Sequence, residues 1–353
     1  MDKMSKKPNR GAKLMKNFIS KVKAGKFSST SIITNRTVNI LREIIKEADW
    51  KNAQRLLVMI KTHGKNLEDA LPVHASVGNM VRRVLKIIRE EYTAARKNKQ
   101  DELDPQDSLH KIVTSEGEID DYSIVVPELK DAILDHISEF QTELETSSEN
   151  IRNQAKEHIH SNEIILTLGR SKIVEQFLKK AAEDRKFEVI VVECAPFNNG
   201  SDMAASLSES NIETTLIPDS AVFAIMSRVN KVIIGTQTVM ANGGLRAICG
   251  SHTAALAANH CSVPVIVLAP LYKFSPQFLC AYAHNTFNTF VSPEGVLDYK
   301  DGDLMSLVHV YNPVFDYVPP ELVTLFISNT GGHAPSYVYR LLSELYHPDD
   351  YSL

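Results

Sequence analysis

The stretch KVIIGTQTVMANGGLRAICGSHTAALAANHCSVPVIVLAP, residues 231–270, decides the fold class of this chain. It contains two short, continuous apolar runs, KVIIG and PVIVLA, and the segment between them includes the helical pattern SHTAALAANH at 251–260. Continuous apolar runs predict strands that are buried on both faces, and a helix between two such strands predicts that they run parallel. The stretch therefore indicates a parallel sheet covered by helices.

The same alternation of apolar runs and helical segments extends in both directions from this stretch. Further strands are expected at 163–169, 188–194, 213–219 and 322–328, and further helices at 171–186, 203–210, 221–228 and 334–346. This pattern is typical of a Rossmann-like α/β domain with a parallel sheet, which we place at 158–353. Ligands of such domains bind beyond the carboxyl ends of the strands, so any chemistry is expected in the loops that follow them.

The chain that precedes this domain has the spacing of helices, and we place a helical domain at 35–157. Its clearest apolar stripe consists of Ile40, Leu41, Ile44 and Ile45. Within the domain, residues 97–122 are polar and nearly free of large apolar side chains, which predicts an exposed, mobile loop. Apolar residues at heptad-like spacing over 129–144 predict a long helix that connects the two domains.

The charge of the chain is unevenly distributed. The formal net charge is −4, yet residues 1–30 hold nine basic residues and one acidic residue, a balance of +8. The remaining residues therefore hold 30 basic and 42 acidic groups, a balance of −12. We predict a basic, disordered arm at 1–34. It is either a solvated terminus or a segment that contacts RNA, a membrane or an acidic partner.

Composition and cysteine spacing exclude several classes of protein. No run approaches the 18 apolar residues of a membrane span, and no secretory signal is evident, so we expect an intracellular protein that does not enter a membrane. The four cysteines form no CxxC pair and have no zinc-like spacing with histidine, which predicts reduced thiols and no metal site. The pair His158 and His160 lacks further ligands and favours a structural or interface role.

The segment VGNMVRRVLKIIREEY, residues 77–92, predicts an amphipathic helix with a basic face. Its apolar side consists of Val81, Val84, Leu85 and Ile88, and its basic residues are Arg82, Arg83, Lys86 and Arg89. A solvated helix face explains these charges in the simplest way. A docking surface for an acidic or phosphorylated partner is the alternative.

The predicted strand ends provide little reactive chemistry. The turn Gly169-Arg170-Ser171-Lys172 offers amides and two cations to an anion, but no GxGxxG or GxxxxGK[ST] motif follows any strand, so we expect no nucleotide cofactor. Cys194 ends the second strand without an identifiable base, which favours a buried, inert thiol over a nucleophile. Gln237 stands after the fourth strand, where an acid–base catalyst needs a group that exchanges protons, and an amide does not.

Several segments together resemble one superfamily. The stretch at 231–270, NPVFDYVPPELVTLFISN, EHIHSNEIILTLG, VVECAPF and APSYVYRLLSELYHPDD are similar to the superfamily that joins methylthioribose-1-phosphate isomerase to the regulatory subunits of eukaryotic translation initiation factor 2B. The resemblance extends from about residue 35 to the end and fails only in the basic arm and the polar loop. It implies the helical and Rossmann-like domains expected above.

The resemblance also implies that the chain is not an enzyme. The isomerases carry a catalytic cysteine after the first strand, where this chain has Gly169, and a catalytic aspartate where it has Gln237. Their substrate-holding asparagine and lysine fall at Ala247 and Ile248. With thiol, carboxylate and cation all absent, proton transfer between sugar carbons has no agent. A residual phosphate pocket would consist of Arg170, Lys172, Asn242 and Gly243.

What the resemblance implies instead is a noncatalytic regulatory and scaffold subunit of the guanine nucleotide exchange factor for translation initiation factor 2, in the cytosol. The implied partners are the alpha, gamma, delta and epsilon subunits of that factor, in a two-fold symmetric assembly, and the alpha subunit of initiation factor 2, whose phosphorylation state is sensed. The basic helix at 77–92 would then dock that partner. His160 and Asn162 would lie at a subunit interface, with satisfied polar groups at a helix end as the simpler alternative.

Two other functions remain as alternatives at this point. One is a working sugar-phosphate isomerase, which the missing thiol and carboxylate disfavour. The other is a metabolite sensor that retains the old pocket, with Arg170, Lys172 and Asn242 holding a phosphate.

Overall fold

The structure is a computed structural model that describes residues 10–27, 29–101, 122–278 and 287–353. The described chain divides into two compact units. The helical unit comprises residues up to Glu145 together with Ser343–Leu353, and the α/β unit comprises Thr146–Leu342. Most of the polar loop predicted at 97–122 lies outside the described residues. The domain bounds expected from the sequence stay a prediction and differ from this division mainly at Ser343–Leu353, which belongs with the helices.

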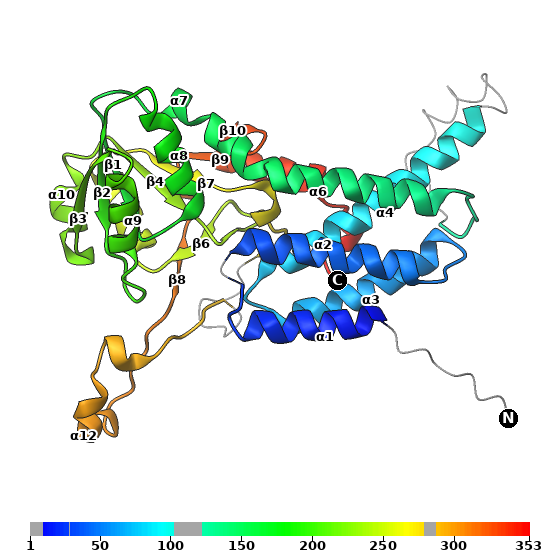
Figure 1. The fold of residues 1–353 in the computed structure, drawn as a ribbon, viewed down its shortest axis with the longest axis horizontal. Coiled ribbons are helices and arrows are strands. Elements are labelled where there is room, and N and C mark those ends of the chain that lie inside the picture. The colour runs from blue at the N-terminus through cyan, green and yellow to red at the C-terminus, as the bar shows by residue number, and fades with distance from the viewer. Residues whose placement is uncertain (1–9, 28, 102–121, 279–286) are drawn as a thin grey trace. The chain divides into compact units, whose positions relative to one another are not determined.

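Long amphipathic helices build the helical unit (Figure 1). They are α1 (Arg10–Lys23), α2 (Thr30–Glu47), α3 (Ala53–Ala70), α4 (Ala75–Asp101) and the first part of α6 (Leu129–Asn153). Helix α4 packs against both α2 and α3, and the predicted stripe from Ile40 to Ile45 is buried. The side chain of Asn52 caps α3, because its Oδ1 accepts a hydrogen bond from the Arg55 amide at 3.1 Å. The predicted helix over 129–144 is the amino-terminal part of α6.

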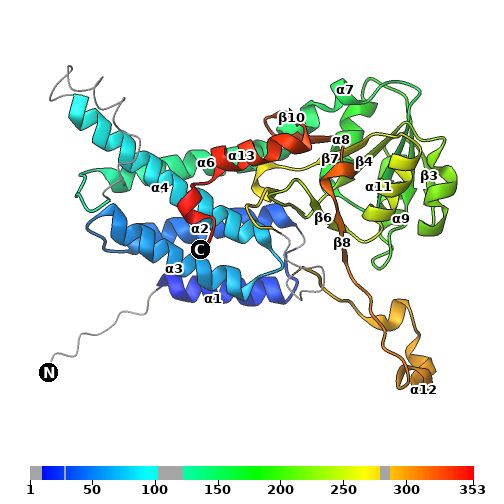
Figure 2. The same cartoon turned by 180° about the vertical axis from the view of Figure 1, so that it is seen from behind.

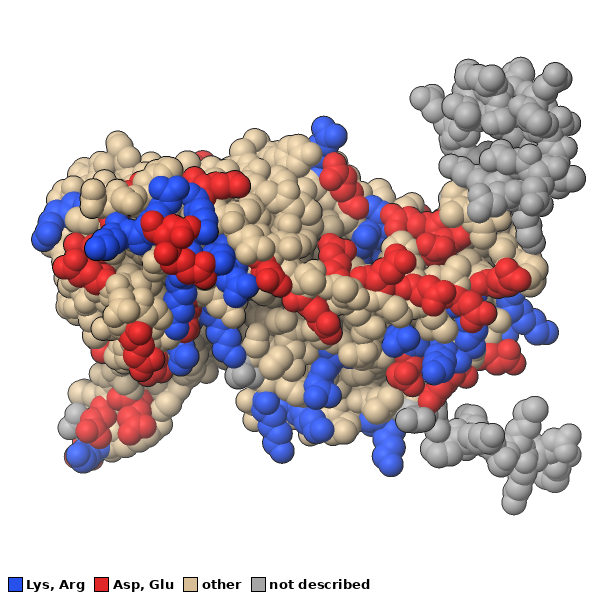
Figure 3. Space-filling view, turned by 45° about the horizontal axis from the view of Figure 1, so that its top comes forward, with Lys and Arg blue, Asp and Glu red and all other residues tan. Residues whose placement is uncertain are grey.

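Part of the basic arm is folded, which corrects the expectation that residues 1–34 are disordered. Helix α1 buries Met15, Phe18 and Val22 and packs against α2, because these side chains recur at helical spacing among the lysines. Its lysines face solvent, and Figure 3 shows Lys and Arg side chains gathered along the edge where α1 lies. Residues 1–9 lie outside the described part of the chain.

The α/β unit confirms the predicted fold class. Its seven-stranded sheet has the order β10-β9-β7-β4-β1-β2-β3, and all neighbours are parallel except β10 and β9. The strands are β1 (Ile164–Leu168), β2 (Glu188–Val192), β3 (Glu213–Ile217), β4 (Lys231–Gly235), β7 (Val265–Leu268), β9 (Leu325–Ser328) and β10 (Gly331–His333). The helices are α7 (Ala155–His158), α8 (Lys172–Ala182), α9 (Gly200–Ser208), α10 (Val222–Met226), α11 (Ser251–His260) and α13 (Val338–Leu345), the last of which continues into the helical unit.

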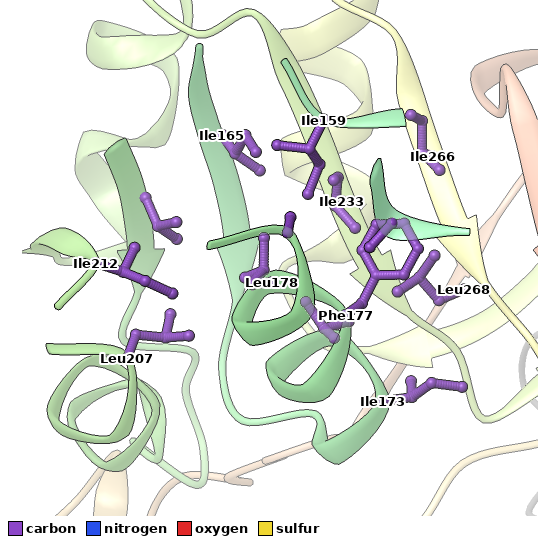
Figure 4. Packing of buried hydrophobic residues seen from close by; sticks show 14 of the residues in the cluster. Ile159, Ile165, Ile173, Phe177, Leu178, Leu207, Ile212, Ile233, Ile266 and Leu268 are labelled. Atoms are coloured by element: carbon purple, nitrogen blue, oxygen red, sulfur yellow. The ribbon is translucent and has the colours of Figure 1, made fainter. Parts of the chain in front are cut away.

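A continuous apolar core holds α8 and α9 against the sheet (Figure 4). Phe177 and Leu178 of α8 are completely buried and lie among side chains from several strands, such as Ile165 of β1 and Ile233 of β4. Residues buried on both faces of the strands explain why the strands read as unbroken apolar runs in the sequence. This core fixes the carboxyl ends of the strands, where a site was expected.

A smaller sheet follows β4 and was not expected from the sequence. Its strands β5 (Thr238–Val239), β6 (Leu245–Ile248) and β8 (Phe315–Val318) pair antiparallel. Before β8, the chain forms an extension at 288–313 that we call the arm, and both views show it reaching away from the large sheet (Figures 1 and 2). The arm contains short 3₁₀ turns and α12 (Gly302–Met305).

No helix in the described ranges combines the length and the apolar composition that crossing a membrane requires.

Candidate functional site

Three glycine turns meet at the carboxyl edge of the large sheet, as the sequence predicted. Gly169 follows β1, Gly235 ends β4 and Gly250 precedes α11. A Cβ built on Gly235 would lie 2.6 Å from Ser171 Oγ in the turn after β1, and one on Gly250 would lie 3.5 Å from Leu168 Cδ2. The loops after β1 and β4 and the start of α11 are thus in direct contact at this edge.

Gly169 occupies a position that has no room for a side chain. Its φ is +52°, in the left-handed region that favours glycine. A Cβ there would lie 2.7 Å from Asn199 Oδ1 and 3.0 Å from Cys194 Cβ. Asn199 Oδ1 also accepts a hydrogen bond from the Arg170 amide at 2.9 Å, which fixes it in place. The position aligned with the isomerase thiol is therefore filled by neighbouring side chains.

Two thiols lie near this turn, and both are held protonated. The Cys194 thiol donates a hydrogen bond to the Cys249 carbonyl oxygen at 3.3 Å. Burial, reinforced by the negative charge of Asp219, raises the pKa of Cys194 to about 12. Burial and Asp316 raise the pKa of Cys249 to about 11. Because the thiolate is the nucleophilic form, neither thiol is reactive near neutral pH, as was predicted for Cys194.

Carboxylates of the chain occupy the backbone donors at this edge. Asp316 Oδ2 accepts from the Gly250 amide at 2.7 Å and from the His252 amide at 3.3 Å, at the start of α11. Asp219 Oδ2 accepts from the Ala195 amide at 3.1 Å. Amides at a helix start are common phosphate ligands, but here an internal anion already satisfies them.

The loop that carries Gln237 is fixed through its backbone. The Gln237 amide donates to the Arg246 carbonyl oxygen at 2.9 Å, and the Thr236 hydroxyl donates to the same oxygen at 2.9 Å. Lys273, which sequence reasoning missed, donates from Nζ to the Thr236 carbonyl oxygen at 2.7 Å. Burial lowers the pKa of Lys273 to about 8. A lone lysine in the turn LYK after β7 gave no signal in the sequence.

The residues of the predicted phosphate pocket fall into two separate places. Arg170 lies after β1, where its guanidinium is 3.6 Å from Glu175 and 3.8 Å from Asp202, and Lys172 is exposed at the start of α8. Asn242 and Gly243 form the turn between β5 and β6.

Asn242 is engaged within that turn and the small sheet. Its Nδ2 donates to the Tyr317 hydroxyl at 2.8 Å, and its Oδ1 accepts from the Gly244 amide at 2.9 Å. Within the described residues, no hydrogen bond or ion pair joins Arg170 or Lys172 to Asn242 or Gly243. Nor do three His, Cys, Asp or Glu side chains in those residues gather closely enough to hold a metal ion. The pocket stays a prediction.

His160 and Asn162 lie before β1, at the edge of the sheet opposite the glycine turns. Both are exposed. The His160 amide donates to Glu163 Oε2 at 2.9 Å, and the Asn162 amide donates to the Lys186 carbonyl oxygen at 2.8 Å. Asn162 adopts a φ of 64°. Their side chains are thus presented by a fixed backbone, and their interface role stays a prediction.

The basic face of α4 lies against residues 343–353, which we call the C-terminal segment. Asp350, with no exposed surface, accepts from Arg89 through two hydrogen bonds, Nε to Oδ2 at 2.9 Å and Nη2 to Oδ1 at 3.0 Å. Lys61 of α3 adds an ion pair to Asp350 at 2.8 Å. Burial alone would lower the pKa of Arg89 and raise that of Asp350. Their mutual hydrogen bonds outweigh burial, so the pKa of Arg89 is raised and that of Asp350 is lowered.

Arg82 and Lys86 bind the backbone of the same segment. Arg82, 2% exposed, donates from Nε and Nη2 to the Tyr351 carbonyl oxygen at 3.2 and 3.1 Å and pairs with Glu68 at 3.1 Å. Lys86 Nζ donates to the Glu344 carbonyl oxygen. Arg83 differs, since it lies 3.9 Å from Glu90 and over the Phe140 ring. Three of the four predicted docking residues thus bind the chain's own C-terminal segment.

Comparisons with known proteins give one consistent result. The family model for the initiation factor 2 subunit family matches residues 27–335. The chain is 45% identical over 355 aligned residues to translation initiation factor eIF2B subunit beta of Dictyostelium discoideum, covering 90% of this chain and 91% of that protein. It is 32% identical to ribose 1,5-bisphosphate isomerase of Archaeoglobus fulgidus, over 62% of this chain and 69% of the enzyme. It is 24% identical to eIF2B subunit delta of Dictyostelium discoideum over 87% of this chain.

Solved structures with this fold include eIF2B proteins of Chaetomium thermophilum. The structure of eIF2B beta has a TM-score of 0.71 at 25% identity and covers 99% of this chain and 95% of that one. A chain of the tetrameric eIF2B-beta2-delta2 complex has the same TM-score and identity, with 96% of each chain covered.

Proposed function

This chain belongs to the initiation factor 2 subunit family, and from that premise we propose that it is the beta-type regulatory subunit of the exchange factor that reloads translation initiation factor 2 with GTP. The observation that carries the proposal is the 45% identity to an eIF2B beta subunit along nine-tenths of the chain. The beta subunit is also the member of the superfamily that the sequence motifs matched best. The chain acts as a noncatalytic, regulatory component of a hetero-oligomer.

The strand-end geometry supports a pseudo-enzyme rather than an isomerase. Gly169 leaves no space for the missing thiol, Gln237 replaces the missing carboxylate, and Asp316 already occupies the amides at the start of α11. An enzyme that moves protons between sugar carbons needs groups that exchange them near neutral pH, and the two thiols at this edge do not.

The proposed partners follow from the relatives. The beta2-delta2 complex supports assembly with a delta-type subunit, and we extend this to the alpha, gamma and epsilon subunits and to the alpha subunit of initiation factor 2, in the cytosol. Arg83 is the residue of the basic helix whose charge does not hold the C-terminal segment, which makes it the first to test for docking. His160 and Asn162 are the exposed candidates for a subunit contact.

Affinity purification of the tagged chain from its own cells, followed by native mass spectrometry, tests the proposal. We expect a hetero-oligomer that contains the other four subunit types and releases GDP from initiation factor 2. A chain that purifies alone, as a monomer without exchange activity in any fraction, contradicts it.

The isomerase relative makes sugar-phosphate isomerisation the second candidate. The purified chain is incubated with methylthioribose-1-phosphate and with ribose 1,5-bisphosphate, and products are followed by ³¹P NMR, with the archaeal enzyme as positive control. We expect no turnover. Calorimetric titration with the same compounds tests the residual pocket, and heat that disappears in Arg170→Ala supports the metabolite-sensor alternative.

A further inference from the structure

The arm at 288–313 has an ordered base. Its two rails are joined by backbone hydrogen bonds from Val291 to Asn312 and from Val314 to Thr289, each at 3.0 Å. Asn288 closes the base, because its Oδ1 accepts from the Val314 amide at 3.1 Å and from the Phe315 amide at 2.9 Å. The arm is therefore held in a defined direction by its own backbone and by β8.

The arm nevertheless buries no apolar side chain of its own. Between Phe287 and Val314, which are 7% and 4% exposed, none of the side chains that the structure describes is buried. Its large apolar side chains are exposed instead, most of all Leu307 at 81% and Tyr311 at 74%. The others beyond the rails are Val296, Tyr299, Leu304 and Val308.

Such a surface is unusual for a segment that works alone. Ordering a backbone costs about 1–2 kcal/mol per residue, and a segment without a core recovers little of this by burial. Concentrated apolar exposure of this kind marks interaction sites. Six side chains that each bury about 100 Å², roughly half of what an aromatic side chain can bury, would cover roughly 600 Å². That approaches the roughly 800 Å² per partner of a stable interface.

We propose that the arm is the contact by which this chain holds a delta-type subunit, with its apolar tip packed on the α/β domain of that partner. The inference rests on the proposed function and names the surface that serves it. The relative's complex contains beta and delta chains in equal number, and delta is itself similar to this chain in sequence. A partner with the same fold has the layered apolar structure on which an arm of this kind can pack.

The charge of the arm favours such a partner over a second copy of this chain. Glu294, Asp298 and Asp303 are exposed around the apolar tip, and Lys300 is the exposed base among them. Two identical arms meeting each other would bring these acidic groups together, which like-charge repulsion disfavours. A different chain is free to present a neutral or basic surface to them.

The test uses the full chain, coexpressed with the other subunits and with a tagged delta-type subunit of the same organism. The variant is the double substitution Leu307→Asp with Tyr311→Ser, and the matched control is Val58→Asp, which changes a 61% exposed apolar side chain on α3. Affinity for the delta-type subunit is measured by titration of the purified components. We expect the arm variant to bind about 30-fold more weakly or worse, as for the loss of central interface anchors, and the control to bind as wild type.

Each outcome has one meaning. Wild-type affinity in the arm variant overturns the inference, and so does a variant that loses only self-association measured without the delta-type subunit. If the wild-type chain itself does not bind that subunit, the proposed function fails rather than the assignment of the arm. Should the variant not fold, hydrogen exchange of the wild-type chain decides, since slowed exchange over 296–311 on complex formation is expected and unchanged exchange overturns the inference.

Discussion

The C-terminal segment and the arm show opposite relations between composition and availability. The first covers a face of α4 that carries the densest positive charge in the helical unit, and Arg82 and Arg89 become buried, hydrogen-bonded groups. The second consists of side chains that normally lie in a core, and it leaves them in solvent. Residue type alone therefore selects the wrong surface in both cases. Which groups a chain satisfies internally is what distinguishes a structural contact from an open one.

The largest effect is expected from removing the buried carboxylate of the C-terminal segment. Asp350→Ala leaves Arg89 buried without its partner, and we expect the free energy of unfolding to fall by about 3–5 kcal/mol, as when one half of a buried ion pair is removed. Chemical denaturation measures it. The control is Asp349→Ala, because Asp349 is 69% exposed and 4.0 Å from Arg89, and we expect a loss within about 1 kcal/mol. Equal losses in the two variants would show that the segment is not held by this pair.

A pH titration sharpens the same contrast with a smaller effect. The pKa of Asp350 is lowered in the folded chain, so the stability from its pairing is fully present above the unfolded pKa of about 3.9 and is lost as the pH falls through the lower folded pKa. The wild type should exceed Asp350→Asn by a constant margin above about pH 5, and that margin should shrink with further acidification. Unfolding measured from pH 3 to pH 7 tests this. A margin independent of pH would assign the stability to packing instead of charge.

The smallest effect is expected in the arm. Leu307→Ser in the isolated chain should change the free energy of unfolding by less than about 0.5 kcal/mol, because the side chain is mostly solvated. The same substitution at Leu85, which has no exposed surface, should cost several kcal/mol and serves as the control. A large loss at Leu307 would mean that the arm packs within its own chain and would remove the contrast.

The sequence predicted the secondary structure of the α/β unit closely, because strands buried on both faces leave unbroken apolar runs. The expected strand at 163–169 is β1 at Ile164–Leu168, and the one at 188–194 is β2 at Glu188–Val192. The arm escaped notice for the same reason, since an exposed Leu307 and a buried Leu268 are the same letter. Helix α1 was missed because its few apolar side chains stand among many lysines.

The candidate site was predictable in its chemistry but not in its geometry. The absence of a thiol at Gly169 and of a carboxylate at Gln237 was visible from the resemblance, and the inert state of Cys194 from the lack of a base. The pairing of Arg89 with Asp350 joins residues 261 positions apart, and no local pattern reports such a contact. Lys273 became interesting only through the Thr236 carbonyl it contacts.

The contact between α4 and the C-terminal segment also sets a timetable for synthesis. A ribosome that adds about 5–20 residues per second needs roughly 15–50 s to proceed from Arg89 to Asp350, which are 261 positions apart. Throughout that interval the nascent helices carry guanidinium groups whose partners have not yet been made. The part of the chain that is translated early is thus completed late, and a product that stops short of Asp350 would retain an open basic face that chaperones and proteases can recognise.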